Sequence, residues 1–305
     1  AAAVLVTEFF VVALPLMITS AKADGHPIQA VTHAGFGGGT DVTTRMMLLR
    51  TRRYLKQDMQ LVNKKGGGGA ASMDYMMTLP ADGQHTLTWT TGHAVSMALG
   101  KTKVKLSDMQ PLARGTDDPQ LFVVNCKNDI KDAKKFISAQ KSKSLKYGTT
   151  HVGGIDDVSA IAFTKKGKLT DPTIVPYKGV GPIKTNLIKG DIDVGVLNLG
   201  EAVTEIEDGT LCVSVVLASN RMEKLSNVPT ATELGIPVVL STVRGFVTKK
   251  GVAGDRKKQL EDAMIKAMEH KYFQSFLTDI GLDSTSVVGA DEWGKQMEVM
   301  LAEMT

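Results

Sequence analysis

Short apolar runs of β-forming residues alternate along the chain with longer segments in which apolar residues recur at helical spacing. The runs that predict strands are residues 28–32, 59–62, 86–89, 121–124, 173–176, 193–197, 213–217 and 244–247. Helices are predicted at residues 42–56 and 70–79, and another is expected to start near residue 158. Strands that alternate with helices are typical of α/β folds with mainly parallel sheets. The pattern therefore predicts an α/β protein.

The C-terminal part of the chain is predicted to be mostly helical. Apolar side chains recur there at i, i+3, i+4 and i+7, the spacing of a helix that packs one face on a core. The three stripes are Leu260, Ala263, Met264, Ala267 and Met268; Phe273, Phe276, Leu277 and Ile280; and Trp293, Met297, Met300 and Leu301. Gly281 can end the second helix in a left-handed cap. The methionines are expected in the core.

The N-terminal segment differs from the rest of the chain. Residues 9–21 are uncharged and mostly apolar, and residues 21–23 form a small-x-small site. This pattern indicates a secretory signal peptide over residues 1–23, with a mature start at Asp24 and export from the cytoplasm, because a membrane span needs about 20 apolar residues. A buried N-terminal helix is the alternative. In an exported protein Cys126 and Cys212 could form a disulfide, or both could be buried free thiols.

Composition narrows the function. Only 5% of the 305 residues are aromatic and the net charge is +4, with no basic runs between aromatics, which disfavours a nucleic-acid role. Six histidines and two cysteines leave little material for metal or thiol chemistry, so no metal site is expected. No cofactor is expected either. The 30 glycines, in contrast, are numerous and clustered.

The most informative glycine cluster is Gly-Phe-Gly-Gly-Gly-Thr-Asp at residues 35–41, between a predicted strand and a predicted helix. Such a loop lets backbone N–H groups approach an anion at a helix N-terminus. The dinucleotide-binding motif G-x-G-x-x-G is not matched, because its third glycine is replaced by Thr40. The P-loop motif is not matched either, because no lysine follows Gly39. Asp41 is expected to cap the helix. A purely structural turn is the alternative.

Two further segments rich in threonine and glycine follow predicted strands, at residues 147–157 and 90–93. Polar loops at strand ends suit binding through the backbone in a crevice. Catalysis fits less well, because the motifs G-x-S-x-G, H-E-x-x-H and C-x-x-C are all absent. We therefore expect His33, His93 and His151 to be structural or to contact a ligand rather than to be catalytic.

Seven segments together resemble one known family. Residues 37–45, GGGTDVTTR, resemble the GGGTD–Arg element of the solute-binding proteins of tripartite tricarboxylate transporters, the Bug-type periplasmic receptors. Further segments resemble the family in the same order: residues 62–70 (VNKKGGGGA), 80–83 (PADG), 146–149 (KYGT), 175–179 (VPYKG), 190–193 (GDID) and 227–235 (NVPTATELG). On these segments the chain is identified as a member.

The resemblance implies a receptor rather than an enzyme, with the two-domain periplasmic-binding-protein fold of type II-like topology and crossing hinge strands. By analogy, residues 24–120 plus 243–305 form one domain and residues 121–242 the other. The domains close on a small carboxylate-bearing solute: a dicarboxylate, tricarboxylate, amino acid or aromatic acid. The implied partners are the membrane permease subunits, with no nucleic acid, and the protein is expected to be a monomer.

The resemblance and the loops together give a predicted ligand-binding set: Phe36, Gly37, Gly38, Gly39, Thr40, Asp41, Thr90, Thr91, His93, Thr149, His151, Gly153, Gly154, Ile155, Asp156, Tyr177, Asn198 and Arg244. Asp157 stands where the family usually has histidine. Asp156 and Asp157 either cap the following helix, the favoured interpretation, or indicate a zwitterionic or less charged solute. Arg244 stands where the family often has an aromatic residue, and it could pair with a carboxylate or form a surface salt bridge.

Two other functions stay open on the residues alone. One is an α/β enzyme that binds a phosphate-bearing cofactor at residues 35–41. The other is the effector-sensing domain of a regulator, which the signal-like N-terminus disfavours. No motif names the solute.

Overall fold

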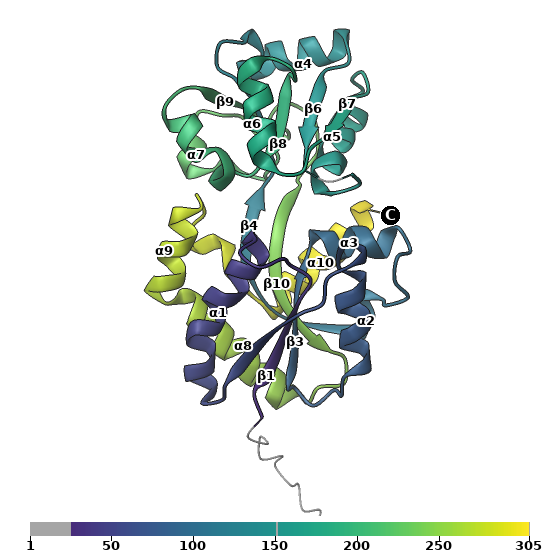
Figure 1. Ribbon diagram of the computed structural model, residues 1–305, viewed down its shortest axis with the longest axis vertical. Coiled ribbons are helices and arrows are strands. Elements are labelled where there is room, and N and C mark those ends of the chain that lie inside the picture. The colour runs from purple at the N-terminus through teal and green to yellow at the C-terminus, as the bar shows by residue number, and fades with distance from the viewer. Residues whose placement is uncertain (1–25, 151, 305) are drawn as a thin grey trace, which may run out of the picture.

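The computed structural model describes residues 26–150 and 152–304 of the chain, which form two lobes, one above the other in Figure 1. Each lobe has a β-sheet flanked by helices. The sheets have the strand orders β11-β4-β10-β3-β1-β2 and β7-β6-β8-β5-β9, and we call the lobes six-stranded and five-stranded after them. The predicted signal peptide, residues 1–23, and the expected mature start at Asp24 lie outside the described residues.

The six-stranded lobe combines the N-terminal and C-terminal parts of the chain. Its strands are β1 (Ile28–Thr32), β2 (Met59–Asn63), β3 (His85–Thr90), β4 (Met109–Pro119), β10 (Ser241–Lys249) and β11 (Val288–Gly289). Its helices are α1 (Gly39–Leu55), α2 (Ala70–Thr78), α3 (Thr91–Ala98), α8 (Gly254–Glu269), α9 (Lys271–Asp279) and α10 (Ala290–Met304). Several of the predicted strand and helix boundaries agree with the observed ones to within one to three residues.

The five-stranded lobe uses the middle of the chain. Its strands are β5 (Leu121–Asn125), β6 (Lys146–Thr149), β7 (Thr173–Pro176), β8 (Val194–Leu197) and β9 (Leu211–Val216). Its helices are α4 (Ala133–Ser142), α5 (Ile155–Lys166), α6 (Val180–Lys189) and α7 (Leu199–Glu207). Because α5 begins at Ile155, the expected start near residue 158 was three residues late.

The α/β class is confirmed, but both sheets are mixed rather than mainly parallel. Strand β1 runs parallel to β2 and β3, and β6 runs parallel to β7 and β8. Strand β10 is antiparallel to β3 and β4, and β5 is antiparallel to β8 and β9. The antiparallel pairing of β4 and β10 arises from the way the chain connects the lobes. The chain leaves the six-stranded lobe along β4 and returns along β10, so these neighbouring strands run in opposite directions (Figure 1).

Each lobe has its own core. Beneath the six-stranded sheet, Trp89 and Trp293 are fully buried and meet edge to face at 5.6 Å. In the five-stranded lobe, Phe122 is packed against Phe163 at 4.9 Å between ring centroids. Ten of the thirteen residues in the predicted helical stripes are buried: Leu260, Ala263, Met264, Ala267, Met268, Phe273, Leu277, Trp293, Met297 and Met300. The other three, Phe276, Ile280 and Leu301, are half-buried. Gly281 follows α9 in the predicted left-handed conformation, with a φ of 82°.

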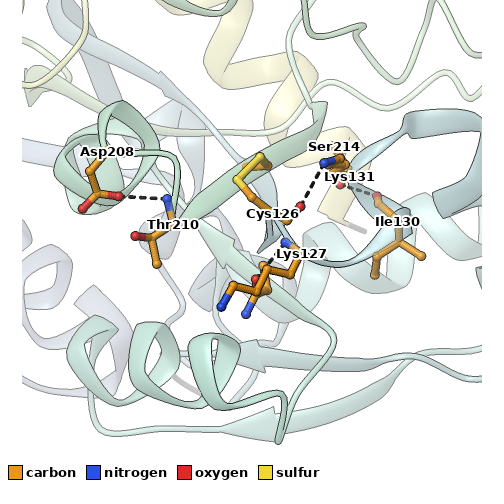
Figure 2. The surroundings of a disulfide bond; sticks show 9 residues. Cys126, Lys127, Ile130, Lys131, Asp208, Thr210 and Ser214 are labelled. Atoms are coloured by element: carbon orange, nitrogen blue, oxygen red, sulfur yellow. Dashed lines mark hydrogen bonds between the residues drawn. A yellow bond between two sulfur atoms is a disulfide. The ribbon is translucent and has the colours of Figure 1, made fainter.

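A disulfide joins Cys126 and Cys212, whose Cα atoms are 5.0 Å apart, so the free-thiol alternative was wrong (Figure 2). Cys126 follows β5, and Cys212 lies in the paired strand β9. The bond closes a sequence separation of 86 residues. In the chain-entropy account, a loop of that length contributes about 4–5 kcal/mol through the unfolded state. The disulfide therefore fixes β9, the outer strand of this sheet.

Among the helices that the structure describes, we find none with both the length and the apolar character that crossing a bilayer requires.

Candidate functional site

The first glycine turn, residues 36–41, joins β1 to α1. Gly37 has a φ of 74°, and its N–H donates to the Asp41 carboxylate at 3.0 Å. Asp41 is the third residue of α1 and reaches back to this turn, whereas Gly38 takes the N-cap position that we expected Asp41 to fill. A helix leaves its first N–H groups without intrahelical acceptors, so those of Gly39 and Thr40 point out of the helix start. The turn is therefore built to present backbone donors to an anion.

The first glycine turn has its own positive charge. Arg45, one helical turn after Asp41, pairs with its carboxylate through Nε at 2.8 Å and Nη2 at 3.2 Å. These hydrogen bonds lower the pKa of Asp41, against the opposing effect of its burial and with help from the Gly37 N–H. Phe36 is 75% exposed at the tip of the turn, with the cations of Arg45 and Lys65 5.9 Å and 5.5 Å from its ring centre. The negative charge of Asp41 is thus compensated locally.

The second glycine turn, residues 152–157, repeats this backbone in the other lobe. Gly153 has a φ of 70°, its N–H donates to the Asp157 carboxylate at 2.6 Å, and Gly154 is the N-cap of α5. Asp156 accepts from the Thr150 N–H at 2.9 Å and from its hydroxyl at 2.6 Å. Both carboxylates accept from backbone N–H groups just before α5. Gly154, rather than either aspartate, takes the N-cap position, so the favoured capping interpretation was wrong in the same way as for Asp41.

The residues next to the second glycine turn differ in exposure. His151 lies outside the described residues, whereas Val152 is 81% exposed. Thr149 is fully buried, and its hydroxyl has no hydrogen-bond partner in the described part of the chain. Its carbonyl accepts from the N–H of Tyr177 at 2.7 Å, which places the half-buried Tyr177 beside the end of β6.

The third predicted loop, residues 90–93, is helical instead. Thr90 is the N-cap of α3, and His93 in the first turn accepts from the Thr90 N–H through Nδ1 at 3.0 Å. The other ring nitrogen of His93 bonds the Ser72 hydroxyl at 3.0 Å. Burial, and after it the proximity of His33, lowers the pKa of His93 well below its usual value. Thr91 donates to the Ser241 carbonyl at 2.8 Å, so His93 and Thr91 already have partners within the protein.

Arg244 links the first glycine turn to the strands that connect the lobes. It lies on β10 opposite Thr116 of β4, and its Nε and Nη1 donate to the hydroxyls of Thr40 and Thr116, both at 3.3 Å. A Cβ atom on Gly39 would stand 2.9 Å from Nη2, so the guanidinium lies against the start of α1. Only 12% of the Arg244 side chain is exposed, which rules out the surface salt bridge that we considered.

Acidic side chains face this arginine, and the sequence did not single them out as ligand-binding. Asp118 on β4 is 5% exposed, with an Oδ2 atom 4.0 Å from Nη1 of Arg244. Its Oδ1 atom is buried and has no hydrogen-bond partner among the residues described. Burial raises the pKa of Asp118 to about 7, against the lowering effect of Arg244. Glu201 and Asp117 raise this pKa by smaller amounts, and the nearby Asn198 side chain lowers it slightly.

Glu201 and Asn198 bring the five-stranded lobe to the same place. The Asn198 amide donates to the backbone carbonyls of Asp118 at 2.8 Å and Pro119 at 3.1 Å, so this predicted ligand contact also holds the lobes together. Glu201, in the first turn of α7, is exposed. Its pKa is raised by partial desolvation and by the charge of Asp156, while the Asn198 N–H, Arg244 and Lys184 lower it.

His33 completes the surroundings of Arg244. Burial, and then the charge of Arg244, lowers the pKa of His33 to about 4, so the ring is neutral at pH 7. It meets His93 edge to face at 4.5 Å. No group of three His, Cys, Asp or Glu side chains within residues 26–150 and 152–304 could hold a metal ion.

The structure brings part of the predicted set to Arg244. The first glycine turn and Thr90 of β3 adjoin it directly, and Glu201 connects it electrostatically to Asp156 of the second turn. A separate cavity of about 660 Å³ lies between the lobes and is lined by Arg114, Asp117, Ser219, Lys224 and Thr285, among others. It touches neither glycine turn, so it is not the predicted site.

Comparison with known proteins places the chain in a family. The family described as the tripartite tricarboxylate transporter family receptor matches residues 43–294. The chain belongs to this receptor family. The protein BugT of Bordetella pertussis is 27% identical over 220 residues, a match that covers 69% of this chain and 66% of BugT, just under two thirds of that protein. The family consists of receptors rather than enzymes, so the enzyme alternative was wrong, and the expected Bug-type identity is confirmed.

Solved structures show the same fold. A TctC solute binding protein from Polaromonas, solved without a ligand, is 24% identical, with a TM-score of 0.84 over 91% of this chain and 96% of that one. MatC from Rhodopseudomonas palustris, solved with bound malate, is 23% identical, with a TM-score of 0.72 over 91% of this chain and 97% of that one. The expected two-lobed binding-protein architecture is confirmed.

Proposed function

We propose that this receptor captures a small carboxylate-bearing organic solute between its two lobes and delivers it to the membrane permease subunits of a tripartite tricarboxylate-type transporter. The observation that carries the proposal is the position of Arg244. A largely buried guanidinium lies against the exposed N-terminus of α1, with Nη2 beside Gly39. A guanidinium and free helix N–H groups are both strong partners for a carboxylate.

The solute's carboxylate fits at the first glycine turn. There the N–H groups of Gly39 and Thr40, together with Arg244, can surround two oxygen atoms. Water-mediated bonds are nearly as favourable enthalpically as direct ones, so a water molecule can complete the shell. The exposed Phe36 and Val152 lie at the tips of the two turns, where they can cover the apolar part of a solute. From the second lobe, Thr149 and the start of α5 are the proposed contacts.

The connection between the lobes supports their closure on a ligand. Only Gln120 separates β4 from β5, and its side chain donates to Thr242 of β10 at 2.8 Å. A short, paired connection suits hinge closure around a ligand. We propose residues 24–120 plus 243–305 and residues 121–242 as the two moving domains, in a monomer exported to the periplasm after loss of residues 1–23.

Calorimetry with matched solutes tests the capture of a carboxylate. We expect at least one carboxylate from a panel of dicarboxylates and amino acids to bind, and its neutral amide counterpart to bind at least about tenfold more weakly, because the amide lacks the charged hydrogen bonds. Small-angle scattering of the saturated protein should show a smaller radius of gyration than that of the free protein. Equal binding of an acid and its amide, or no binding by any carboxylate of the panel, would contradict the proposal.

A further inference from the structure

We propose that the solute is an α-amino acid, whose ammonium group is bound by Asp118 and Glu201 while its carboxylate is bound by Arg244 and the first glycine turn. This inference rests on the proposed function and specifies the chemistry of the same site. It starts from an imbalance of charge. Arg244 faces Asp118 on its own lobe and Glu201 from the other, and Asp156 lies near Glu201. An incoming carboxylate adds one more negative charge to this group.

Asp118 is the side chain that needs a donor. It is 5% exposed, its Oδ1 atom lacks a hydrogen-bond partner in the described structure, and its Oδ2 atom is 4.0 Å from Nη1 of Arg244. That distance is longer than a charged hydrogen bond, which is about 2.7–2.9 Å. A buried carboxylate without a donor is destabilising, and a ligand that supplies N–H groups removes this cost.

The geometry favours a positive charge close to the carboxylate of the solute. Arg244 and Asp118 are neighbours on adjacent strands, so their partner groups on the solute are also neighbours. In an α-amino acid one carbon atom bears both the carboxylate and the ammonium, so a single head group can reach both side chains. A dicarboxylate can satisfy Arg244 but brings a second like charge toward Asp118 and Glu201.

The other charges near Asp118 support the same assignment. Lys184 pairs with Glu205 at 2.7 Å, His33 is neutral at pH 7, and Asp117 pairs with Arg114 at 2.9 Å. Arg244 is the one cation that acts on both Asp118 and Glu201 in the described residues. When its guanidinium turns to a carboxylate, the ammonium group takes its place beside the two acidic side chains.

The test compares pairs of solutes that differ only in the amino group: aspartate against succinate, and glutamate against glutarate. We measure their affinities by calorimetry at pH 8, where Asp118 is mostly charged. In at least one pair we expect the amino acid to bind about 10–100-fold more tightly than the dicarboxylate that lacks the amino group. This difference corresponds to one charged hydrogen bond. If succinate and glutarate bind as well as the amino acids or better, the inference is overturned while the proposed function stands. If no solute of either set binds, both are contradicted.

Variants locate the effect. D118N and E201Q should each reduce the preference for the amino acid about tenfold or more. The affinity for the matching dicarboxylate should stay the same or increase. Glu201 is exposed and its glutamine can still accept from the Asn198 N–H, so E201Q is expected to fold. The matched control is E207Q, an exposed position on the same helix, which should change neither affinity. An unchanged preference in both D118N and E201Q would overturn the assignment.

Discussion

The two glycine turns have the same backbone but opposite electrostatics. In each, a glycine with a φ near 70° donates its N–H to an aspartate four residues later: Gly37 to Asp41 and Gly153 to Asp157. Each turn also places a glycine at the N-cap of the helix that follows. The same turn geometry therefore precedes α1 in one lobe and α5 in the other. It follows from the spacing of four residues between the glycine and the aspartate.

The difference lies in what surrounds the aspartates. The fourth residue after Asp41 is Arg45, which pairs with it, whereas the fourth residue after Asp157 is Ile161. The second turn also has Asp156, whose charge reaches Glu201. One turn is thus neutral or positive and the other is negative. The comparison teaches that one backbone device can carry opposite charge in the two lobes, because the side chains around it set the sign.

The largest expected effect comes from removing the cation beside the first turn. R244Q should weaken carboxylate binding by about 10–100-fold, since a charged hydrogen bond contributes about 1.5–3 kcal/mol. Calorimetry measures the affinity. The control is R221Q, in which an exposed arginine paired with Glu233 at 2.9 Å is changed, and binding should not change. An unaltered affinity in R244Q would place the carboxylate away from the first turn.

The shared backbone predicts equal penalties at the two turn glycines. G37A and G153A should each lower the free energy of unfolding by about 1–2 kcal/mol, because a Cβ atom at positive φ is strained and neither site has a neighbour within 4 Å of that atom. Urea unfolding gives both values. G181A, in helix α6 with open space around the new Cβ, should instead be neutral or stabilising by about 0.5 kcal/mol. Clearly unequal losses at the two turns would break the comparison.

The charges predict unequal penalties at the two aspartates. D41N should lower the free energy of unfolding by about 1 kcal/mol at pH 7, since it removes the charged bond to Arg45. The folded state lowers the pKa of Asp41, so this stabilisation is complete above the unfolded pKa of about 3.9 and is lost as the pH falls through the folded value. D157N keeps an acceptor for the Gly153 N–H and has no arginine to lose, so its change should be below about 0.5 kcal/mol.

For D41N and D157N, unfolding in urea at pH 7 and at pH 3 provides the measurement. The difference between D41N and the parent protein should shrink at pH 3. A difference that is the same at both pH values would show that the charge of Asp41 is unimportant. Equal losses in the two variants at pH 7 would show that Arg45 does not distinguish the turns.

The smallest expected effect comes from transferring the arginine. I161R places an arginine four residues after Asp157, as in the first turn, and should stabilise the protein by about 0.2–0.5 kcal/mol, the value of such a helical pair. Ile161 is 38% exposed, so the longer side chain has room. R45Q should act in the opposite direction and less strongly than D41N. Thermal unfolding of both variants checks these signs, and a destabilised I161R would contradict the role given to position 45.

Much of the fold was predictable because its signals are local. The run at residues 28–32 coincides with β1, and the C-terminal stripes coincide with buried faces of α8, α9 and α10. The long strand β4 was not predicted, because its sequence MQPLARGTDDP contains prolines and a pair of aspartates and lacks alternation. It is extended because it pairs with β10 along most of its length. Helix α3 was taken for a loop, since its signal is the Thr90–His93 capping box rather than a stripe.

The candidate site, like the fold, was predictable only where its signals are local in the sequence. Both glycine turns were identified from the sequence, because helix starts and positive φ values depend on neighbouring residues. Arg244 stood out only as a departure from the family pattern. Asp118 and Glu201 were missed as site residues, because no motif in the neighbouring sequence singles them out. They lie 126 and 43 residues before Arg244 in the sequence, and only the folded structure brings them close to it.

The sequence by itself determined the alternation of strands and helices, the two glycine turns, the core stripes and the receptor family. The tertiary structure alone decided that Cys126 and Cys212 are bonded, that β4 and β10 connect the lobes side by side, and that Arg244 faces acidic side chains from both lobes. The physical reason is one of range. Backbone conformation follows from neighbours in the chain, whereas burial and electrostatic interaction depend on distances in space.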